Sequence, residues 1–213
     1  MDQVSKQKFI RELYKRNTPD LINKLKDHNI GIAGCGGLGS NIAVMLVRAG
    51  ISNIVLVDYD KVDLPNLNRQ HFFLDDVGKN KTEALSSILK KINPYINIKI
   101  INQKLIQKDI AKVFYDCSII IEAFDTVEAK SMILEAFSDK KLSSKYLIGA
   151  SGLAGIGTAN SIQTKQMGHN IFICGDFITG ADDSIGLMSP RVMITAGHQA
   201  NMSLRIISKI NKP

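Results

Sequence analysis

Cysteine is scarce in this sequence of 213 residues, and tryptophan is absent. The three cysteines, Cys35, Cys117 and Cys174, lie far apart and include no C-x-x-C pair. Their spacing argues against a disulfide framework and against a zinc site built from cysteines. Free thiols are typical of a reducing compartment, so we expect a cytoplasmic protein.

The sequence also lacks long apolar runs and blocks of like charge. No apolar run approaches the roughly 20 residues that span a bilayer, and the starting segment MDQVSKQKFIREL is polar and charged. We therefore expect no contact with a membrane. The 27 basic and 20 acidic residues are scattered along the chain. Their net charge of +7 favours solubility and attraction to nucleotide phosphates over nucleic-acid binding.

Apolar residues make up 45% of the chain, as in an ordinary folded protein, and they follow two periodicities. Continuous apolar segments predict buried strands, and helical spacing predicts helices between them. The predicted strands are 30–33, 54–57, 96–102, 118–123 and 146–150, and the predicted helices between them are 40–48, 79–91, 107–115 and 127–139. This alternation is typical of a doubly wound, mostly parallel, Rossmann-like α/β sheet.

We expect a single domain over residues 1–213, built in three parts. Residues 1–28 form a helical arm, with one helix at 3–15 and a short one after Pro19. Residues 29–150 form a nucleotide-binding core. The remainder, 151–213, adds a small antiparallel extension from segments 151–164 and 169–174, a mobile loop at 175–187 and a closing helix at 190–210.

The segment GCGGLG, residues 34–39, stands between the first predicted strand and a helix. In this context glycines let backbone N–H groups approach phosphate oxygens, and the helix start adds a partial positive charge. Asp58 follows the next strand, where an acid accepts hydrogen bonds from ribose hydroxyls. A nucleotide site is the favoured interpretation. The alternative is a tight turn in which Asp58 caps the strand end.

The connection after Asp58 concentrates acids, amides and one arginine in the segment DYDKVDLPNLNRQ. Cations, amides and a metal-holding acid suit a triphosphate, whereas a nicotinamide pocket needs few charged groups. Arg69 and Lys81 supply the cations. The sequence therefore favours ATP, and a nicotinamide-dependent oxidoreductase stays as the alternative.

Asp125 follows the apolar run 119–121, at the carboxyl end of a predicted strand. Open α/β sheets bind their ligands at this edge. A carboxylate there could hold Mg²⁺ together with phosphate oxygens. Because a helix follows, an N-cap role for Asp125 is the alternative.

The segment GCGGLG, the pair Asp58-x-Asp60, the segment NLNRQ at 66–70, Lys81 and Asp125 occur in this order within residues 30–150. Together they resemble the ThiF/MoeB/HesA family of adenylyltransferases, which are relatives of the ubiquitin-activating enzymes. The segments 146–157 and 189–201 resemble the compact ThiF-like branch associated with thiamine biosynthesis.

The resemblance implies ATP-dependent adenylylation of the C-terminal glycine carboxylate of a small ubiquitin-like sulfur carrier that ends in Gly-Gly, with release of pyrophosphate. A ThiS-like carrier of thiamine thiazole biosynthesis is the expected substrate, and a molybdopterin-type carrier is the alternative. Asp125 is the implied ligand of Mg²⁺. The implied catalytic residues are Arg69, Lys81, Asp125, Asn68 and Arg16, and the implied nucleotide-binding residues are Gly34, Gly36, Gly37, Gly39, Asp58, Asp60, Asn66 and Gln70.

Arg16 enters because family members commonly borrow an arginine from the N-terminal segment of a partner subunit. The resemblance therefore implies a homodimer, although Arg16 could equally be an ordinary solvated charge. The sequence departs from many members in lacking two C-x-x-C pairs, so we expect no zinc. Cys174 is the candidate for sulfur chemistry, but a small buried side chain is the favoured role. We therefore expect a separate sulfur donor protein.

Overall fold

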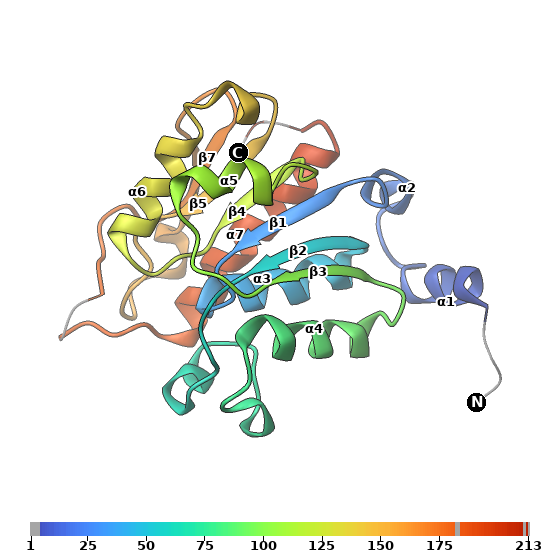
Figure 1. The fold of residues 1–213 in the computed structure, drawn as a ribbon, viewed down its shortest axis with the longest axis horizontal. Coiled ribbons are helices and arrows are strands. Elements are labelled where there is room, and N and C mark those ends of the chain that lie inside the picture. The colour runs from blue at the N-terminus through green and yellow to red at the C-terminus, as the bar shows by residue number, and fades with distance from the viewer. Residues whose placement is uncertain (1–4, 182–183, 211, 213) are drawn as a thin grey trace.

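A seven-stranded sheet forms the centre of the molecule in the computed structural model, which describes residues 5–181, 184–210 and 212. The strand order is β3-β2-β1-β4-β5-β7-β6 (Figure 1). Neighbouring strands pair in parallel except β6 and β7, which are antiparallel. The strands are β1 (Asn29–Ala33), β2 (Asn53–Val57), β3 (Asn97–Ile101), β4 (Ile119–Glu122), β5 (Tyr146–Ala150), β6 (Gln163–Gln166) and β7 (Ile171–Gly175). This arrangement confirms the predicted mostly parallel, Rossmann-like fold.

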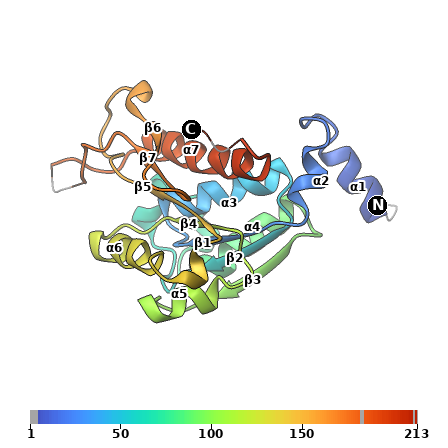
Figure 2. The same cartoon turned by 90° about the horizontal axis from the view of Figure 1, so that it is seen from above.

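Helices cover both faces of the sheet (Figure 2). The helices α3, α4 and α7 share an apolar core with one face, and α5 and α6 share a second core with the other. Their bounds are α3 (Gly37–Ala49), α4 (Lys81–Ile92), α5 (Gln107–Val113), α6 (Val127–Ala136) and α7 (Ser189–Ile207). The central strand β4 is buried at every position, which explains its continuous apolar sequence. No described helix has the length and apolar character needed to cross a membrane.

The extension after β5 differs from the prediction. The strand expected over 151–164 is wrong for most of its length, because Gly152 and Gly155 adopt positive φ angles of 78° and 72° and turn the chain. Strand β6 begins at Gln163, and β7 pairs in parallel with β5 on its other side. The antiparallel extension is therefore one pair of strands. Residues 182 and 183 of the predicted 175–187 loop lie outside the described residues.

The N-terminal arm holds two short helices, α1 (Lys6–Leu13) and α2 (Leu21–Leu25). The hydroxyl of Tyr14 donates to the Val47 carbonyl at 2.8 Å, and the Asn17 amide donates to the Ala49 carbonyl at 2.8 Å. Both acceptors lie in the last turn of α3. The arm is thus fixed at the end of α3 that is remote from the glycine segment, as Figure 1 also shows.

Candidate functional site

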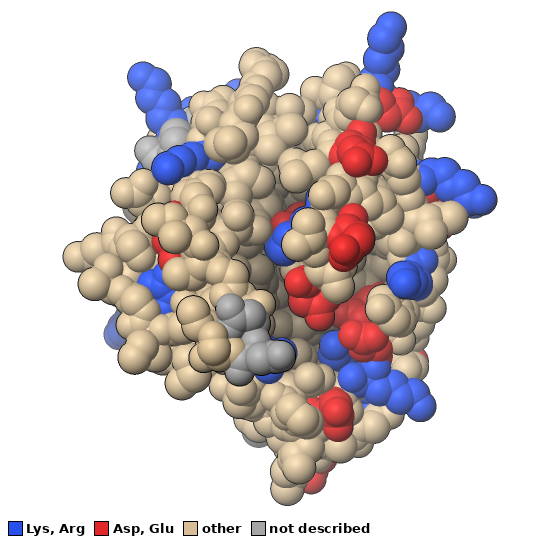
Figure 3. Space-filling view, turned by 90° about the vertical axis from the view of Figure 1, so that its left-hand side faces the viewer, with Lys and Arg blue, Asp and Glu red and all other residues tan. Residues whose placement is uncertain are grey.

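The carboxyl ends of the parallel strands lie at one edge of the sheet, where open α/β folds bind ligands. Figure 3 views the molecule from the left-hand side of Figure 1 and shows this surface hollowed along its middle. Acidic side chains gather along one side of the hollow. The loops after β1, β2 and β4 bring most of the predicted site residues to this edge.

The glycine segment forms a short loop followed directly by a helix. Helix α3 begins at Gly37, three residues earlier than predicted, so Gly37 and Gly39 lie in its first turns. A Cβ atom on Gly39 would lie 1.9 Å from the Gly34 carbonyl oxygen, and Gly34 itself has φ = +98°. A Cβ atom on Gly36 would meet nothing closer than 3.7 Å. Gly34 and Gly39 therefore serve chain geometry, whereas Gly36 leaves the helix start open to a phosphate group.

Asp58 ties the strand end to the glycine loop. One of its carboxylate oxygens accepts the N–H of Cys35 at 2.6 Å, and the other accepts the N–H of Asp60 at 2.8 Å. Burial raises the pKa of Asp58 above its ordinary value, although the two backbone hydrogen bonds and the charge of Lys81 oppose this shift. Asp58 thus makes the contacts expected of a residue that caps the end of the strand. A carboxylate has lone pairs left after these bonds, so ribose binding by Asp58 stays a prediction.

Lys81 lies at the start of α4 and pairs with Asp60. Its ammonium group is 2.8 Å from an Asp60 carboxylate oxygen, and its backbone N–H donates to the Asp60 carbonyl. The Lys81 side chain is 9% exposed, whereas that of Asp60 is 41% exposed. The lysine is therefore held beside the acidic end of β2 by both its side chain and its backbone.

Arg69 follows a 3-10 helix at Leu64–Asn68 and lies against the first turn of α3. Its Cγ atom would be 3.6 Å from a Cβ atom placed on Gly37. The Asn68 side-chain oxygen accepts a hydrogen bond from the Arg69 guanidinium at 2.8 Å. Asn68 therefore orients the cation that the sequence assigned to the phosphates.

Two amides of the NLNRQ segment differ in what they contact. The side-chain oxygen of Asn66 accepts the N–H of Asp63 at 3.1 Å and closes a capping box, so this oxygen shapes the turn. Gln70 is buried, and its nitrogen would be 3.7 Å from a Cβ atom placed on Gly36. Its side-chain oxygen has no hydrogen-bond partner within the described part of the chain. The structure thus places Gln70 beside the glycine loop and uses Asn66 to hold the turn.

Ser40 and Asn41 fix this loop and were missed by the sequence reasoning. The Asn41 amide donates to the carbonyls of Gly37 and Arg69, at 2.7 and 3.0 Å. The Ser40 hydroxyl oxygen accepts the N–H of His71 at 3.0 Å. Both side chains are buried. Two polar residues inside the otherwise apolar helix segment SNIAVML were the signal that could have found them.

Asp125 is exposed in the loop between β4 and α6. The N-cap of α6 is Thr126, whose hydroxyl accepts the N–H of Ala129 at 3.3 Å. The capping alternative for Asp125 is therefore wrong. The loop lies close to the glycine loop, because a Cβ atom on Gly34 would be 2.6 Å from the Ala123 carbonyl oxygen.

Arg16 does not join this site within one chain. It lies in the arm, two residues after Tyr14, at the far end of α3 from Gly37. A helix of 13 residues is about 20 Å long at 1.5 Å per residue. If Arg16 acts on the phosphates, it must therefore act on those of another copy of the chain.

The cysteines are buried and unsuited to nucleophilic chemistry in this conformation. Burial raises the pKa of the Cys174 thiol to about 12, and burial also raises the pKa of Cys35 well above its ordinary value. Across the described residues, no group of three or more histidine, cysteine, aspartate or glutamate side chains could hold a metal ion.

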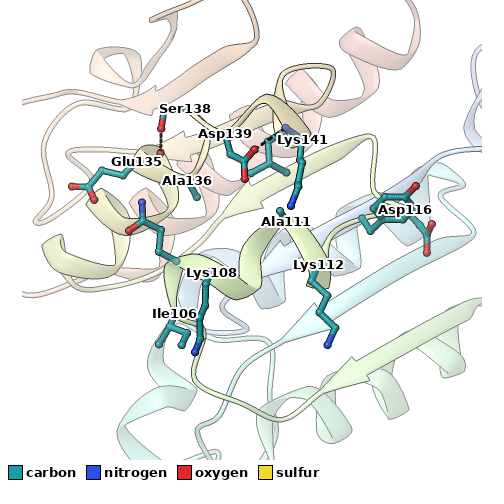
Figure 4. Close-up of a pocket in the computed structure, with 13 residues that line it drawn as sticks. Ile106, Lys108, Ala111, Lys112, Asp116, Glu135, Ala136, Ser138, Asp139 and Lys141 are labelled. Atoms are coloured by element: carbon teal, nitrogen blue, oxygen red, sulfur yellow. Dashed lines mark hydrogen bonds between the residues drawn. The ribbon is translucent and has the colours of Figure 1, made fainter.

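A separate cavity of about 1010 Å³ lies between α5, α6 and the short turn at 140–142. Lysine, acidic and apolar side chains from both helices line it (Figure 4). None of the predicted site residues belongs to this lining. The chemistry of the carboxyl edge therefore does not extend to it.

Comparison with known proteins decides the family. Residues 11–213 match the model of the ThiF family. The chain belongs to the ThiF family. The resemblance seen in the GCGGLG and NLNRQ segments is thereby confirmed. The matched residues make up nearly the whole of this chain.

The curated relatives are activating enzymes. The chain is 27% identical over 194 residues to the molybdopterin-synthase adenylyltransferase of Escherichia coli (strain K12), which covers 89% of this chain and 76% of that protein. It is 37% identical over 111 residues to the same enzyme of Haemophilus influenzae, and 41% identical over 87 residues to ubiquitin-like modifier-activating enzyme 5 of Oryza sativa subsp. japonica. These two matches cover 52% and 41% of this chain. They span 46% and 21% of those proteins.

Solved structures share the fold. E. coli tRNA N6-threonylcarbamoyladenosine dehydratase, TcdA, in complex with ATP matches with a TM-score of 0.82 at 19% identity, over 94% of this chain and 93% of that one. E. coli MccB with ATP matches with a TM-score of 0.68 at 26% identity, over 91% of this chain and 60% of that one.

Proposed function

We propose that this ThiF-family protein is an ATP-dependent adenylyltransferase that activates the C-terminal carboxylate of a small ubiquitin-like carrier. The observation that carries the proposal is the set of groups around the glycine loop. Arg69 lies against the first turn of α3, Lys81 is held beside Asp60, and Asp125 is left exposed on the adjoining loop. Relatives named adenylyltransferases and fold neighbours solved with ATP support the same activity.

The chemistry required is the joining of two anions. A terminal carboxylate has a pKa of about 3.5, so it is ionised at neutral pH and needs no general base. One of its oxygens attacks the α-phosphorus of ATP, the bond from that phosphorus to the β-phosphate bridge oxygen breaks, and pyrophosphate leaves. Arg69 and Lys81 reduce the repulsion and stabilise the charge that builds on the leaving group.

The other predicted groups would position the nucleotide. The backbone N–H groups at Gly36 and Gly37 would bind a phosphate at the start of α3. Asp58 would accept the ribose hydroxyls, and Asn68 would keep the Arg69 guanidinium in place. Gln70 supplies an amide beside Gly36. Each side chain then binds or orients, and none needs to exchange a proton.

Mg²⁺ suits the residues at this edge. The Asp125 carboxylate is exposed and does not cap α6, so its oxygens are available to a hard cation that keeps several waters and phosphate oxygens as ligands. When bound, the ion would supply positive charge next to the phosphates. Asp125 is the residue that would hold it.

A protein substrate fits the loops after β5 and β7. Ile156 is 86% exposed and Ile178 is 87% exposed, and these loops follow strands that end at the same edge as β4. We propose that these two side chains contact the carrier. A carrier whose C-terminal tail enters the hollow would cover them.

The thiamine carrier remains our specific prediction for the substrate. Two of the relatives are named molybdopterin-synthase adenylyltransferase and ubiquitin-like modifier-activating enzyme 5, so a molybdopterin-type carrier is the alternative to test beside it. Because Cys174 is buried with a raised pKa, we also propose that a separate protein supplies the sulfur.

Arg16 is proposed to complete the site of a partner copy, which makes the protein a homodimer. The position of Arg16 about 20 Å along α3 from its own glycine loop supports action in trans. A mixed dimer of Arg16→Ala and Asp125→Ala chains retains one site with both residues. We expect that mixture to recover part of the activity that each variant loses alone. No recovery would remove the role in trans.

ATP–pyrophosphate exchange tests the proposed function. Exchange should require a carrier that ends in Gly-Gly, and it should fall to background with Lys81→Ala or Asp125→Ala. Exchange with no carrier dependence would contradict a protein substrate. A titration in which NAD binds and ATP with magnesium does not would instead favour the oxidoreductase alternative.

A further inference from the structure

A buried ion pair lies beside the site, on residues that the sequence reasoning did not select. The guanidinium of Arg191, in the first turn of α7, is 2.5 Å from a carboxylate oxygen of Asp176, which follows β7. The two side chains are 3% and 7% exposed. A charged pair with so little water around it needs further hydrogen bonds on both partners to offset its desolvation.

The loop after β5 supplies some of these additional hydrogen bonds to Arg191. The guanidinium donates to the carbonyl of Thr158 at 2.8 Å and to the hydroxyl of Ser161 at 3.4 Å. A Cβ atom on Gly157 would lie 3.2 Å from the same nitrogen, so the loop approaches the guanidinium closely. The Nε–H group of Arg191 is buried and has no acceptor in the described part of the chain.

Asp176 stabilises the turn that follows β7 by accepting several hydrogen bonds from it. One carboxylate oxygen accepts the N–H groups of Ile178 and Thr179, both at 2.9 Å. The other accepts the Thr179 hydroxyl at 2.8 Å in addition to the arginine. The Asp176 backbone N–H donates to the Gly152 carbonyl at 2.8 Å. We call Arg191, Asp176 and these direct partners the Arg191 clasp. It joins three segments: 152–161, 176–179 and the start of α7.

The clasp connects to the nucleotide groups through the next residue of α7. A Cβ atom on Gly37 would be 3.2 Å from Val192 Cγ1 and 3.6 Å from Arg69 Cγ. The first turn of α7 therefore abuts the start of α3 on one side and holds the clasp on the other. A displacement of Arg191 would move the loops at 152–161 and 176–179 without removing a group that faces the phosphates.

Stability alone does not account for this arrangement. Replacing a buried ion pair with apolar side chains of similar volume is often neutral or stabilising. An additional buried N–H without an acceptor further lowers stability. What the pair provides, and an apolar pair would not, is a fixed set of directional contacts between three segments.

We propose that Arg191 and Asp176 are positioning residues that fix the wall along which the carrier tail reaches the nucleotide. The proposal rests on the proposed adenylyltransferase function. Neither residue touches the nucleotide. Each holds the loops after β5 and β7 in place, including the exposed residues Ile156 and Ile178.

The test separates carrier binding from nucleotide binding. In Arg191→Met and Asp176→Asn variants, the KM for the carrier should rise about tenfold or more, because misplaced loops weaken the alignment of the tail. The dissociation constant of ATP should stay within about twofold of the wild-type value, since neither substitution removes a group that the proposed function places on the nucleotide. Arg205→Met is the matched control. Arg205 lies in the last turn of the same helix and donates to a backbone carbonyl near the end of the chain.

Hydrogen exchange gives a readout that needs no carrier. Amide protection should fall in 152–161 and 176–179 in both variants and stay unchanged in α3. Asp176→Asn keeps an acceptor for the turn, so it provides a folded variant should Arg191→Met fail to fold. Equal losses of carrier and ATP binding, or an unchanged carrier KM with reduced loop protection, would overturn the proposal. If the wild-type protein shows no ATP–pyrophosphate exchange with any carrier, the proposed function fails instead. The amide protection pattern then still tests whether the Arg191 clasp holds the two loops.

Discussion

The two halves of the carboxyl edge are built differently. The nucleotide half, the loops at 34–36, 58–80 and 123–126, contains residues that the sequence selected as motifs, such as Asn68 and Arg69, which contact each other. The tail half, residues 151–161, 175–181 and 184–192, is joined by Arg191 and Asp176, which form no motif in the sequence. The nucleotide half therefore shows in the sequence as motifs, whereas the tail half becomes visible when the chain is folded.

The comparison also separates the two tasks of the proposed reaction. Charge around the glycine loop suits a ligand that is the same in every ATP-dependent reaction. The loops of the tail half and their exposed isoleucines suit a protein ligand, the carrier, which differs from one activating enzyme to another. We therefore expect variants in the two halves to fail in different ways.

The largest effect is expected for Arg69→Ala in the nucleotide half. Loss of a cation that stabilises the leaving pyrophosphate should lower the rate of ATP–pyrophosphate exchange about 100-fold or more. The carrier KM should change little. Arg48→Ala is the control, because Arg48 is an exposed arginine at the other end of α3. An Arg69→Ala enzyme that keeps its exchange rate and loses carrier binding would reverse the assignment of the halves.

Each half contains a glycine whose replacement by alanine should disturb that half. A Cβ atom on Gly39 would be 1.9 Å from the Gly34 carbonyl oxygen, and one on Gly152 would be 2.1 Å from an Asp176 carboxylate oxygen. We expect either alanine to lower the free energy of unfolding by about 1–3 kcal/mol. Gly39→Ala should weaken ATP binding, and Gly152→Ala should raise the carrier KM.

Gly180→Ala is the control for this pair. A Cβ atom there would have nothing within 4 Å, so the free energy of unfolding should change by less than about 0.5 kcal/mol. The three variants are compared by three measurements on the same preparations. Denaturant unfolding gives the free energy of unfolding, ATP titration gives the ATP affinity, and carrier-dependent kinetics give the carrier KM. If both strained variants lose ATP binding equally, the two halves are not independent.

The sequence predicted the strands and helices that carry the glycine loop, because residue types and spacing there follow recognisable patterns. The strand at 146–150 and the family motifs were recognised from residue types and spacing, and β5 has those bounds. The capping alternative for Asp125 could not be resolved, because both roles require an acid before a helix. The extended segment expected over 151–164 was wrong, because the positive φ angles at Gly152 and Gly155 depend on contacts with the loop after β7 and with Ile185. Arg191 had no local signal, since its partners lie 15 to 33 residues away.

A smaller effect is expected for Asn41→Ala, which tests the support of the nucleotide half. The substitution removes the donor to the carbonyls of Gly37 and Arg69 and leaves them without that partner. Loss of these two part-buried hydrogen bonds should lower the free energy of unfolding by about 1–3 kcal/mol. ATP affinity should fall while the carrier KM holds. Normal ATP affinity with lowered stability would show that Asn41 supports the helix and not the loop.

The smallest effect is a pH dependence of stability, which involves one histidine of the nucleotide half and one of helix α7. Burial lowers the pKa of His71 in the nucleotide half, with the charge of Arg48 adding to the shift, and burial lowers the pKa of His198 on α7. The unfolded chain therefore binds protons more readily than the folded one, so stability falls as the pH drops through the ordinary histidine value of about 6.5.

Unfolding titrations between about pH 7.5 and pH 5.5 measure this slope. The substitutions His71→Gln and His198→Gln should each make it shallower. His169→Gln is the control, because His169 is exposed in the turn before β7. A slope that neither half-buried histidine alters would contradict the assignment of the stability loss to them.

Mass spectrometry of the carrier tests the central claim most directly. After incubation with the protein, ATP and magnesium, a ThiS-like or molybdopterin-type carrier should gain one AMP on its C-terminal glycine, and a carrier that lacks this glycine should gain none. Hydroxylamine should release the AMP, as expected for an acyl phosphate anhydride. A carrier that stays unmodified while ATP is bound, or one that is modified equally without its terminal glycine, would contradict activation of a carrier carboxylate at this edge of the sheet.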